Sequence, residues 1–160
     1  MIRNQIEAVV NQLVSKPKFL YGTINELNLF ADDTSFATGV VMLYTLKPID
    51  VSTTLSNSVN SKYSLYLEFL YKTEFDNYSF QNEEIVLQAE QLCNEFLVKL
   101  EYYRESPNES RYFKIHRGEN AKCLPVYNKS SLDVNSTGVS LIITLNTMNN
   151  QAYDPTTRPV

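Results

Sequence analysis

Apolar residues recur at helical spacing in two segments of the chain. In the first, residues 2–15, one face of the predicted helix carries Ile2, Ile6, Val9, Val10, Leu13 and Val14. Pro17 must end this helix. The second helix is expected from Asn82 to Arg104, with acidic residues at its start and basic residues near its end, as the helix dipole favours. Its apolar positions are Ile85, Ala89, Leu92, Cys93, Phe96, Leu97 and Leu100.

Alternation of apolar and polar residues predicts strands elsewhere. The clearest strand is 62–72, whose apolar face is Tyr63, Leu65, Leu67, Phe69 and Tyr71. Residues 39–46 are apolar on both faces, as in a central strand covered on each side. We expect further strands at 19–22, 111–117, 121–127 and 139–148, with a turn at 118–120 and a loop at 135–138. The segment 23–35 is expected to be irregular or a single helical turn.

These elements predict an α+β fold, in which a mixed, mainly antiparallel sheet is flanked by an N-terminal helix and one long central helix. The length of 160 residues suits one domain, placed at 1–148. Residues 49–61, rich in Ser, Thr, Asn and Val, fit a hairpin arm or a long loop within that domain. Residues 149–160 contain two prolines and no apolar periodicity, and predict an extended C-terminal arm.

Composition and charge narrow the classes of function. No apolar run approaches the roughly eighteen residues of a membrane helix, and the first sixteen residues contain no contiguous signal-peptide core. We therefore expect a cytosolic protein. The net charge of −4, without a cluster of Lys and Arg, argues against specific nucleic-acid binding.

The two cysteines, Cys93 and Cys123, exclude a disulfide framework, and their spacing is not that of a metal site. Both are interpreted as reduced thiols of the core. His116 is the single histidine and lies in a charged strand without a neighbouring Ser or Cys nucleophile, which favours a surface or cross-strand polar residue over a general base. An enzyme built on Cys93, His116 and Asp133 is the last-ranked hypothesis, because Cys93 falls on the buried stripe of its helix.

Sequence patterns for bound metals and cofactors are missing as well. Asp32, Asp33 and Asp50 do not follow the alternating ligand pattern of a calcium loop and are interpreted as solvated loop acids. The four glycines are too far apart for a phosphate-binding loop. We therefore predict no catalytic residue, no cofactor and no metal, and a protein that is not an enzyme.

Tyrosines gather in two places, around the 62–72 strand and around the end of the second helix. They are Tyr63, Tyr66, Tyr71, Tyr102, Tyr103 and Tyr112. Large side chains with a polar tip suit protein interfaces, and the edges of a core explain them equally well.

The order of elements resembles the tail-terminator and neck-ring proteins of tailed bacteriophages: a helix, three strands, a long helix, closing strands and a polar C-terminal arm. Residues 21–28, 65–72 and 135–141 look like segments of tail-associated structural proteins from phages of gut Bacteroidetes, including crAss-like phages. The resemblance covers most of the chain.

This resemblance implies a virion protein that forms a closed ring in the neck or tail and is made in the host cytoplasm during assembly. Its partners would be copies of itself and neighbouring portal, neck or tail proteins, and genomic DNA would pass through an acidic lumen without specific binding. Residues 49–61 and 149–160 would be the clasping arms. The alternative hypothesis is a cytosolic adaptor that captures another chain by strand addition at an open sheet edge or at 49–61.

Overall fold

A computed structural model of the chain describes residues 2–23, 26–27, 38–45, 47–53, 59–74, 78–103, 113–115, 121–131 and 134–149. The elements in chain order are α1 (Ile2–Val10), β1 (Lys18–Gly22), β2 (Val40–Tyr44), β3 (Lys47–Thr53), β4 (Val59–Thr73), the 3-10 turn η2 (Ser79–Asn82), α3 (Glu83–Tyr102), β5 (Phe113–Ile115), β6 (Lys122–Ser131) and β7 (Val134–Asn149). In these residues the strands form one sheet of seven, ordered β1-β2-β4-β7-β5, with β3 paired to β4 and β6 paired to β7.

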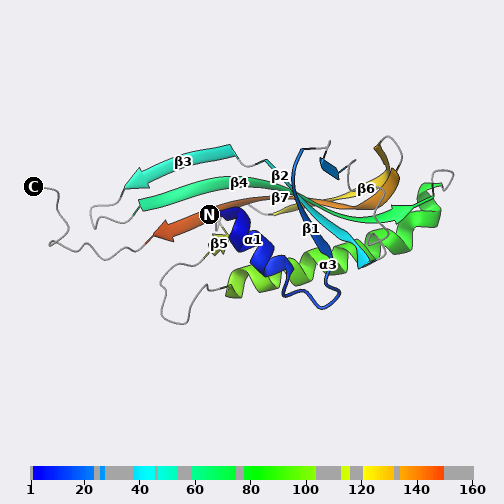
Figure 1. The fold of residues 1–160 in the computed structure, drawn as a ribbon, viewed down its shortest axis with the longest axis horizontal. Coiled ribbons are helices and arrows are strands. Elements are labelled where there is room, and N and C mark those ends of the chain that lie inside the picture. Colours follow the sequence, from blue (N-terminus) through cyan, green and yellow to red (C-terminus); the bar gives the residue numbers. More distant parts are fainter. Residues whose placement is uncertain are drawn as a thin grey trace, which may run out of the picture.

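The fold class is the predicted one. β1 and β2 pair in parallel, whereas every other described pair is antiparallel, so the sheet is mixed and mainly antiparallel. An N-terminal helix and a long central helix accompany it (Figure 1). The chain is therefore an α+β protein.

β4 and β7 form the centre of the sheet and pair along nearly their whole length, from Val59 opposite Asn149 to Thr73 opposite Asn135. The two backbones approach closely at Gly138, where a Cβ atom would lie 1.8 Å from the carbonyl oxygen of Phe69. Only glycine fits such a contact, so Gly138 is required for these strands to meet.

Both helices join one face of the sheet in a single core. Alternate β4 residues point into this core, together with Val139, Leu141, Ile143 and Leu145 of β7. From the helices come Ile6, Val9, Val10, Ala89, Leu92, Cys93, Phe96 and Leu100. The rings of Phe69 and Phe96 pack 5.5 Å apart between β4 and α3. The apolar faces predicted for the 62–72 strand, the last strand and the central helix are confirmed.

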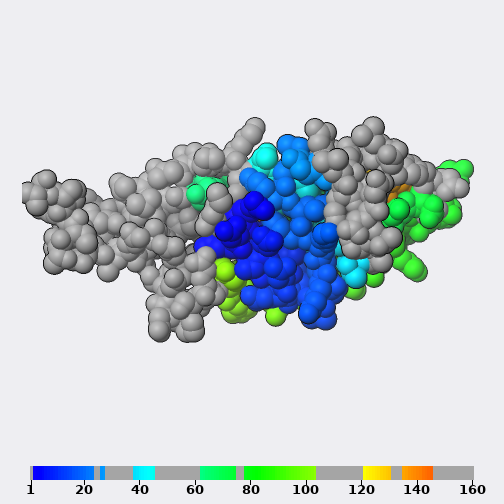
Figure 2. Space-filling model, in the orientation of Figure 1, coloured from blue at the N-terminus to red at the C-terminus, as the bar shows by residue number. Residues whose placement is uncertain are grey.

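The other face of the sheet has a smaller core. It consists of Leu27, Val40, Met42 and Leu70, with Leu20 and Tyr44 packed against them. β2 is thus buried on both sides, as its uninterrupted apolar sequence predicted. Figure 2 shows the N-terminal residues, in blue, filling the middle of one surface of the molecule.

The first helix is shorter than predicted. α1 ends at Val10 and the chain continues in turns to Lys16, whose φ of 47° redirects it into β1. Leu13 remains buried, but Val14 is 86% exposed. The periodicity to residue 14 is therefore only partly helical, because after Val10 the backbone bonds are turn bonds, from Gln12 to Val9 and from Leu13 to Val10.

The last strands differ from the prediction in their limits. β7 begins at Val134, so the loop expected at 135–138 is wrong and these residues belong to the central strand. β6 extends to Ser131 through an irregularity between Val126 and Lys129, where Asn128 has a φ of 47°. Polar residues in this region suggested a loop, but tertiary hydrogen bonds hold them in the sheet.

The segment 49–61 includes strand residues on both sides of 54–58, which lie outside the described residues. β3 pairs antiparallel with the beginning of β4, from Lys47 opposite Ser64 to Thr53 opposite Val59. Figure 1 shows β3 and the adjoining ends of β4 and β7 running on beyond both helices. We call β3, residues 59–64 and residues 144–149 the projecting ribbon. Most of the arm predicted at 149–160 lies outside the described residues.

None of the helices in the described ranges has the length and apolar content needed to cross a membrane.

Candidate functional site

A cluster of charged and phenolic side chains lies on the sheet face opposite the two helices. Glu68 of β4 is at its centre and is only 2% exposed. Its neighbours are Tyr44 on β2, Tyr66 on β4 and Lys129 on β6. Sequence alternation predicted a polar position at Glu68 but gave no sign that it is buried. We call these four residues the Glu68 cluster.

Every oxygen of the buried carboxylate has partners. The Lys129 ammonium donates to both Glu68 oxygens, at 2.7 and 2.6 Å. Tyr44 donates its hydroxyl hydrogen to Oε2 at 2.6 Å, and Tyr66 donates to Oε1 at 3.0 Å. Lys129 also donates to the Tyr44 hydroxyl at 2.8 Å. Because buried charges are costly without such partners, this pairing is what allows Glu68 to be buried.

The phenols are held in their protonated form. Burial raises the pKa of Tyr44, and the Glu68 carboxylate that accepts its hydrogen bond raises it further. The pKa of Tyr66 is raised by burial first and then by the Glu68 charge. At neutral pH both hydroxyls therefore act as hydrogen-bond donors. The cluster links three strands through charge-assisted bonds, which are stronger than bonds between neutral groups.

A second buried polar group surrounds the start of β7. Asn135 donates from Nδ2 to the Thr73 hydroxyl at 3.1 Å, to the Glu74 carbonyl at 2.9 Å and to Oδ1 of Asn128 at 2.9 Å. The same Asn128 oxygen accepts from Asn82, at the start of α3, at 2.9 Å. These amides tie β4, β6, β7 and α3 together, which explains why a polar segment forms a strand here.

The two cysteines lie side by side. The Cys93 sulfur on α3 and the Cys123 sulfur on β6 are 4.0 Å apart. Cys93 is buried, as predicted, but Cys123 is exposed, so its assignment to the core is wrong. The error has a structural cause, since β6 lies beside β7 near the margin of the sheet and its side chains are only partly covered.

The other candidates from the sequence are not brought together in the described structure. His116, Asp133, Asp32 and Asp33 lie outside the described residues, and Asp50 is on β3. Within the described part of the chain, no group of three or more His, Cys, Asp or Glu side chains could hold a metal ion.

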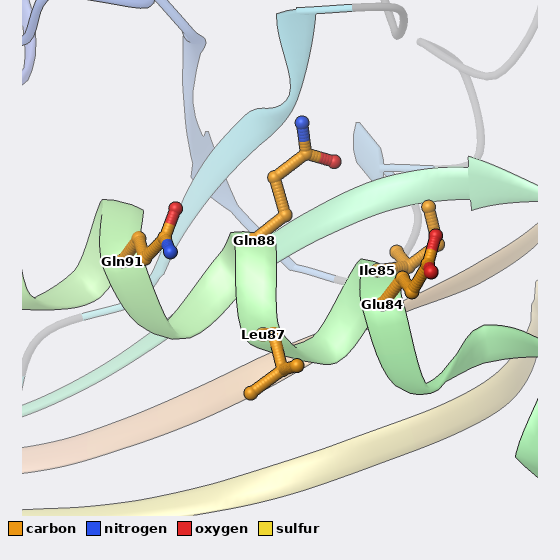
Figure 3. A pocket seen from close by; sticks show the side chains of 5 residues that line it. All are labelled: Glu84, Ile85, Leu87, Gln88 and Gln91. Atoms are coloured by element: carbon orange, nitrogen blue, oxygen red, sulfur yellow. The ribbon is translucent and has the colours of Figure 1, made fainter.

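A shallow depression of about 330 Å³ follows the exposed side of α3, lined by Glu84, Ile85, Leu87, Gln88 and Gln91. All five residues come from one helix, and Figure 3 shows Leu87 pointing away from Gln88. Ligand sites normally converge several polar groups on an enclosed, largely apolar space. This depression does not have that arrangement.

Apolar side chains are exposed on the same face as the Glu68 cluster. Tyr66 and Ile142 are register partners on β4 and β7, and each is 38% exposed. Leu124, on the neighbouring β6 strand, is 52% exposed. Aromatic and aliphatic side chains gathered on a sheet face suit contact with another protein. We call Tyr66, Leu124 and Ile142 the apolar patch.

No protein-family model matches this chain, and no curated protein matches its sequence. The fold and the described side chains define an α+β protein with one mixed sheet, a helical layer on one face and a partly open second face.

Proposed function

We propose that this chain is a structural virion protein that forms a ring in the neck or tail of a tailed bacteriophage and joins neighbouring components around the DNA channel. The resemblance of its element order and of residues 21–28, 65–72 and 135–141 to tail-terminator and neck-ring proteins motivates the proposal. The particular class suggested is that of crAss-like or other Bacteroidetes phages.

The projecting ribbon is the observation that carries the proposal. It consists of β3, β4 and β7, with β5 paired to β7 at residues 145–147, and it extends past the helices that cover one face of the sheet (Figure 1). Within the described residues no helix lies over the outer part of this ribbon, and a narrow ribbon without a covering layer gains little stability from its own packing. Contact with an adjacent copy would supply the missing layer, and a head-to-tail contact repeated around a closed ring leaves no subunit unpaired.

Two further features support a role in assembly. The apolar patch gives the open sheet face a surface suited to a second protein contact. The net charge of −4 suits a channel wall, because acidic side chains repel the DNA phosphates and let the duplex slide. The proposed partners are therefore copies of this chain and the portal, neck or tail proteins above and below the ring.

Sedimentation velocity and negative-stain electron microscopy of the purified full chain test the proposal. We expect closed rings of uniform size at micromolar concentration, with or without partner rings added. A chain that stays monomeric at high concentration, even with candidate neck and tail partners, would contradict the proposal.

A variant without the hairpin arm makes the test specific to the ribbon. Residues 47–62 are replaced by a short Gly-Ser turn, which is feasible because β2 and β4 already run antiparallel, with Leu43 opposite Leu67. We expect this variant to keep a cooperative unfolding transition and to lose the ring. Rings that persist in a folded variant would show that the ribbon is not the contact.

A second candidate function, a protein-binding adaptor that acts by strand addition, is favoured by the β6 edge. Within the described residues β6 pairs with β7 alone, which leaves the other side of its backbone for an added strand. Mass spectrometry of purified virions separates the two functions. A chain present in stoichiometric amounts supports the ring, whereas a chain made during infection but missing from virions favours the adaptor.

A further inference from the structure

Cys93 and Cys123 have the geometry of an unformed disulfide. Their sulfurs are 4.0 Å apart across the contact between α3 and β6. A disulfide bond is about 2.05 Å long, so the sulfurs need to close by roughly 2 Å, which side-chain rotation and a small shift of an edge strand can provide. The two residues are 30 positions apart in sequence and meet only through the fold.

The two thiols differ in access. Cys123 is exposed on β6, whereas Cys93 is 1% exposed and lies on the buried stripe of α3. A dissolved oxidant therefore reaches Cys123 first. Cys93 is placed behind it, where it can attack the oxidised Cys123 sulfur from within the protein. This is the division of roles between an exposed reacting cysteine and a resolving cysteine.

The surroundings make both thiols slow to react. Burial raises the pKa of Cys93, and the neighbouring Cys123 and the Glu90 carboxylate raise it further. Burial also raises the pKa of Cys123, although the hydrogen bond with Cys93 lowers it in part and Glu90 adds a smaller increase. Because the thiolate is the nucleophile, the pair stays reduced under reducing conditions and needs a sustained oxidant to change.

We propose that Cys93 and Cys123 are a dithiol site that forms a reversible intramolecular disulfide when a peroxide or a small-molecule disulfide oxidises the exposed thiol. The inference stands independently of the proposed function. The bond would fasten β6, which otherwise pairs with β7 on one side, to the middle of α3. Oxidation would thus stabilise the margin of the sheet.

The reaction balances with hydrogen peroxide as the oxidant. The Cys123 thiolate attacks one peroxide oxygen, the O–O bond breaks, and the departing hydroxide takes up a proton to give water and a sulfenic acid. The Cys93 sulfur then attacks the Cys123 sulfur, the S–S bond forms, and the S–O bond breaks. The second hydroxide takes the Cys93 proton and leaves as water. Two thiols lose two electrons in total, and the peroxide gains them.

Oxidation of the reduced full chain by oxidised glutathione tests the proposal. After incubation for hours, remaining thiols are alkylated and the protein is analysed by intact mass and by peptide mapping without reductant. We expect a monomer whose mass falls by about 2 Da, with Cys93 and Cys123 in one linked peptide pair. The unfolding temperature should rise by on the order of 10 °C and return to its original value with dithiothreitol.

Two variants separate the intramolecular bond from other cysteine chemistry. Cys93→Ala should trap a stable glutathione adduct on Cys123, because the resolving thiol is missing. Cys123→Ser should show neither a mass decrease nor a change in unfolding temperature. The proposal is overturned if the wild-type chain keeps two alkylatable thiols, retains the adduct as the Cys93→Ala variant does, or forms a cross-linked dimer through Cys123.

Discussion

Glu68 shows how a single residue depends on partners from other strands. Its carboxylate is nearly inaccessible to water, and the Lys129 ammonium is the positive charge that compensates it. The alternation of β4 places Glu68 opposite the apolar face, so a reader of the sequence expects it in solvent. Its burial results from β6 and β2, which bring Lys129 and Tyr44 over it.

Lys129→Met should lower the free energy of unfolding by about 2 kcal/mol. The loss is smaller than that for a fully buried pair because 25% of the Lys129 side chain is exposed. Urea unfolding at neutral pH measures it, and Lys122→Met, at an exposed position of the same strand, is the control and should change stability by under about 0.5 kcal/mol. Equal effects of the two variants would show that the Glu68 pair contributes nothing.

Among the elements, β7 differs most from what its sequence predicts. Its apolar half, from Val139 to Leu145, alternates clearly and was predicted. Its first half contains Asn135, Ser136 and Thr137, which are typical loop residues, yet all three are buried. Local propensity favours a turn there, and the amide contacts to β4, β6 and α3 override it. In α3 and β4, by contrast, pattern and packing agree.

Substitutions of Asn135 test whether its amide contacts hold residues 135–137 in β7. Asn135→Ala should cost about 2–3 kcal/mol of unfolding free energy, because it removes the buried donor to the Glu74 carbonyl and one of the two donors to the Asn128 oxygen. Asn135→Asp should cost more, since a carboxylate cannot donate and is itself buried. Chemical denaturation gives the free energies. An Asp variant as stable as wild type would contradict the proposed donor role.

The whole molecule has two unlike faces. One carries both helices and the main core, and the other exposes the apolar patch around the Glu68 cluster. The sequence predicted two helices and a mixed, mainly antiparallel sheet, but it could not predict which polar face would carry contiguous apolar side chains. Tyr66, Leu124 and Ile142 come from three strands, and only their lateral order in the sheet makes them neighbours.

Ile142→Lys tests the apolar patch as an assembly surface. The side chain is 38% exposed, so we expect the free energy of unfolding to change by under about 1 kcal/mol. The dissociation constant of self-association should rise at least tenfold. Sedimentation equilibrium gives the association constant. Leu87→Lys on the outer side of α3, which is 57% exposed, is the matched control and should assemble like wild type. Equal association constants for the two variants would show that the apolar patch is not part of the interface.

The sequence by itself determined the alternation and helical periodicity that place β4, α3 and the apolar half of β7, because those patterns repeat within a few residues of the chain. The tertiary structure alone decided the partners of Glu68, the strand at 135–138 and the meeting of the two thiols. Glu68 and Lys129 are 61 positions apart, and Cys93 and Cys123 are 30 apart. Contacts across such separations follow from strand order and register, which depend on the packing of the entire sheet rather than on any local pattern.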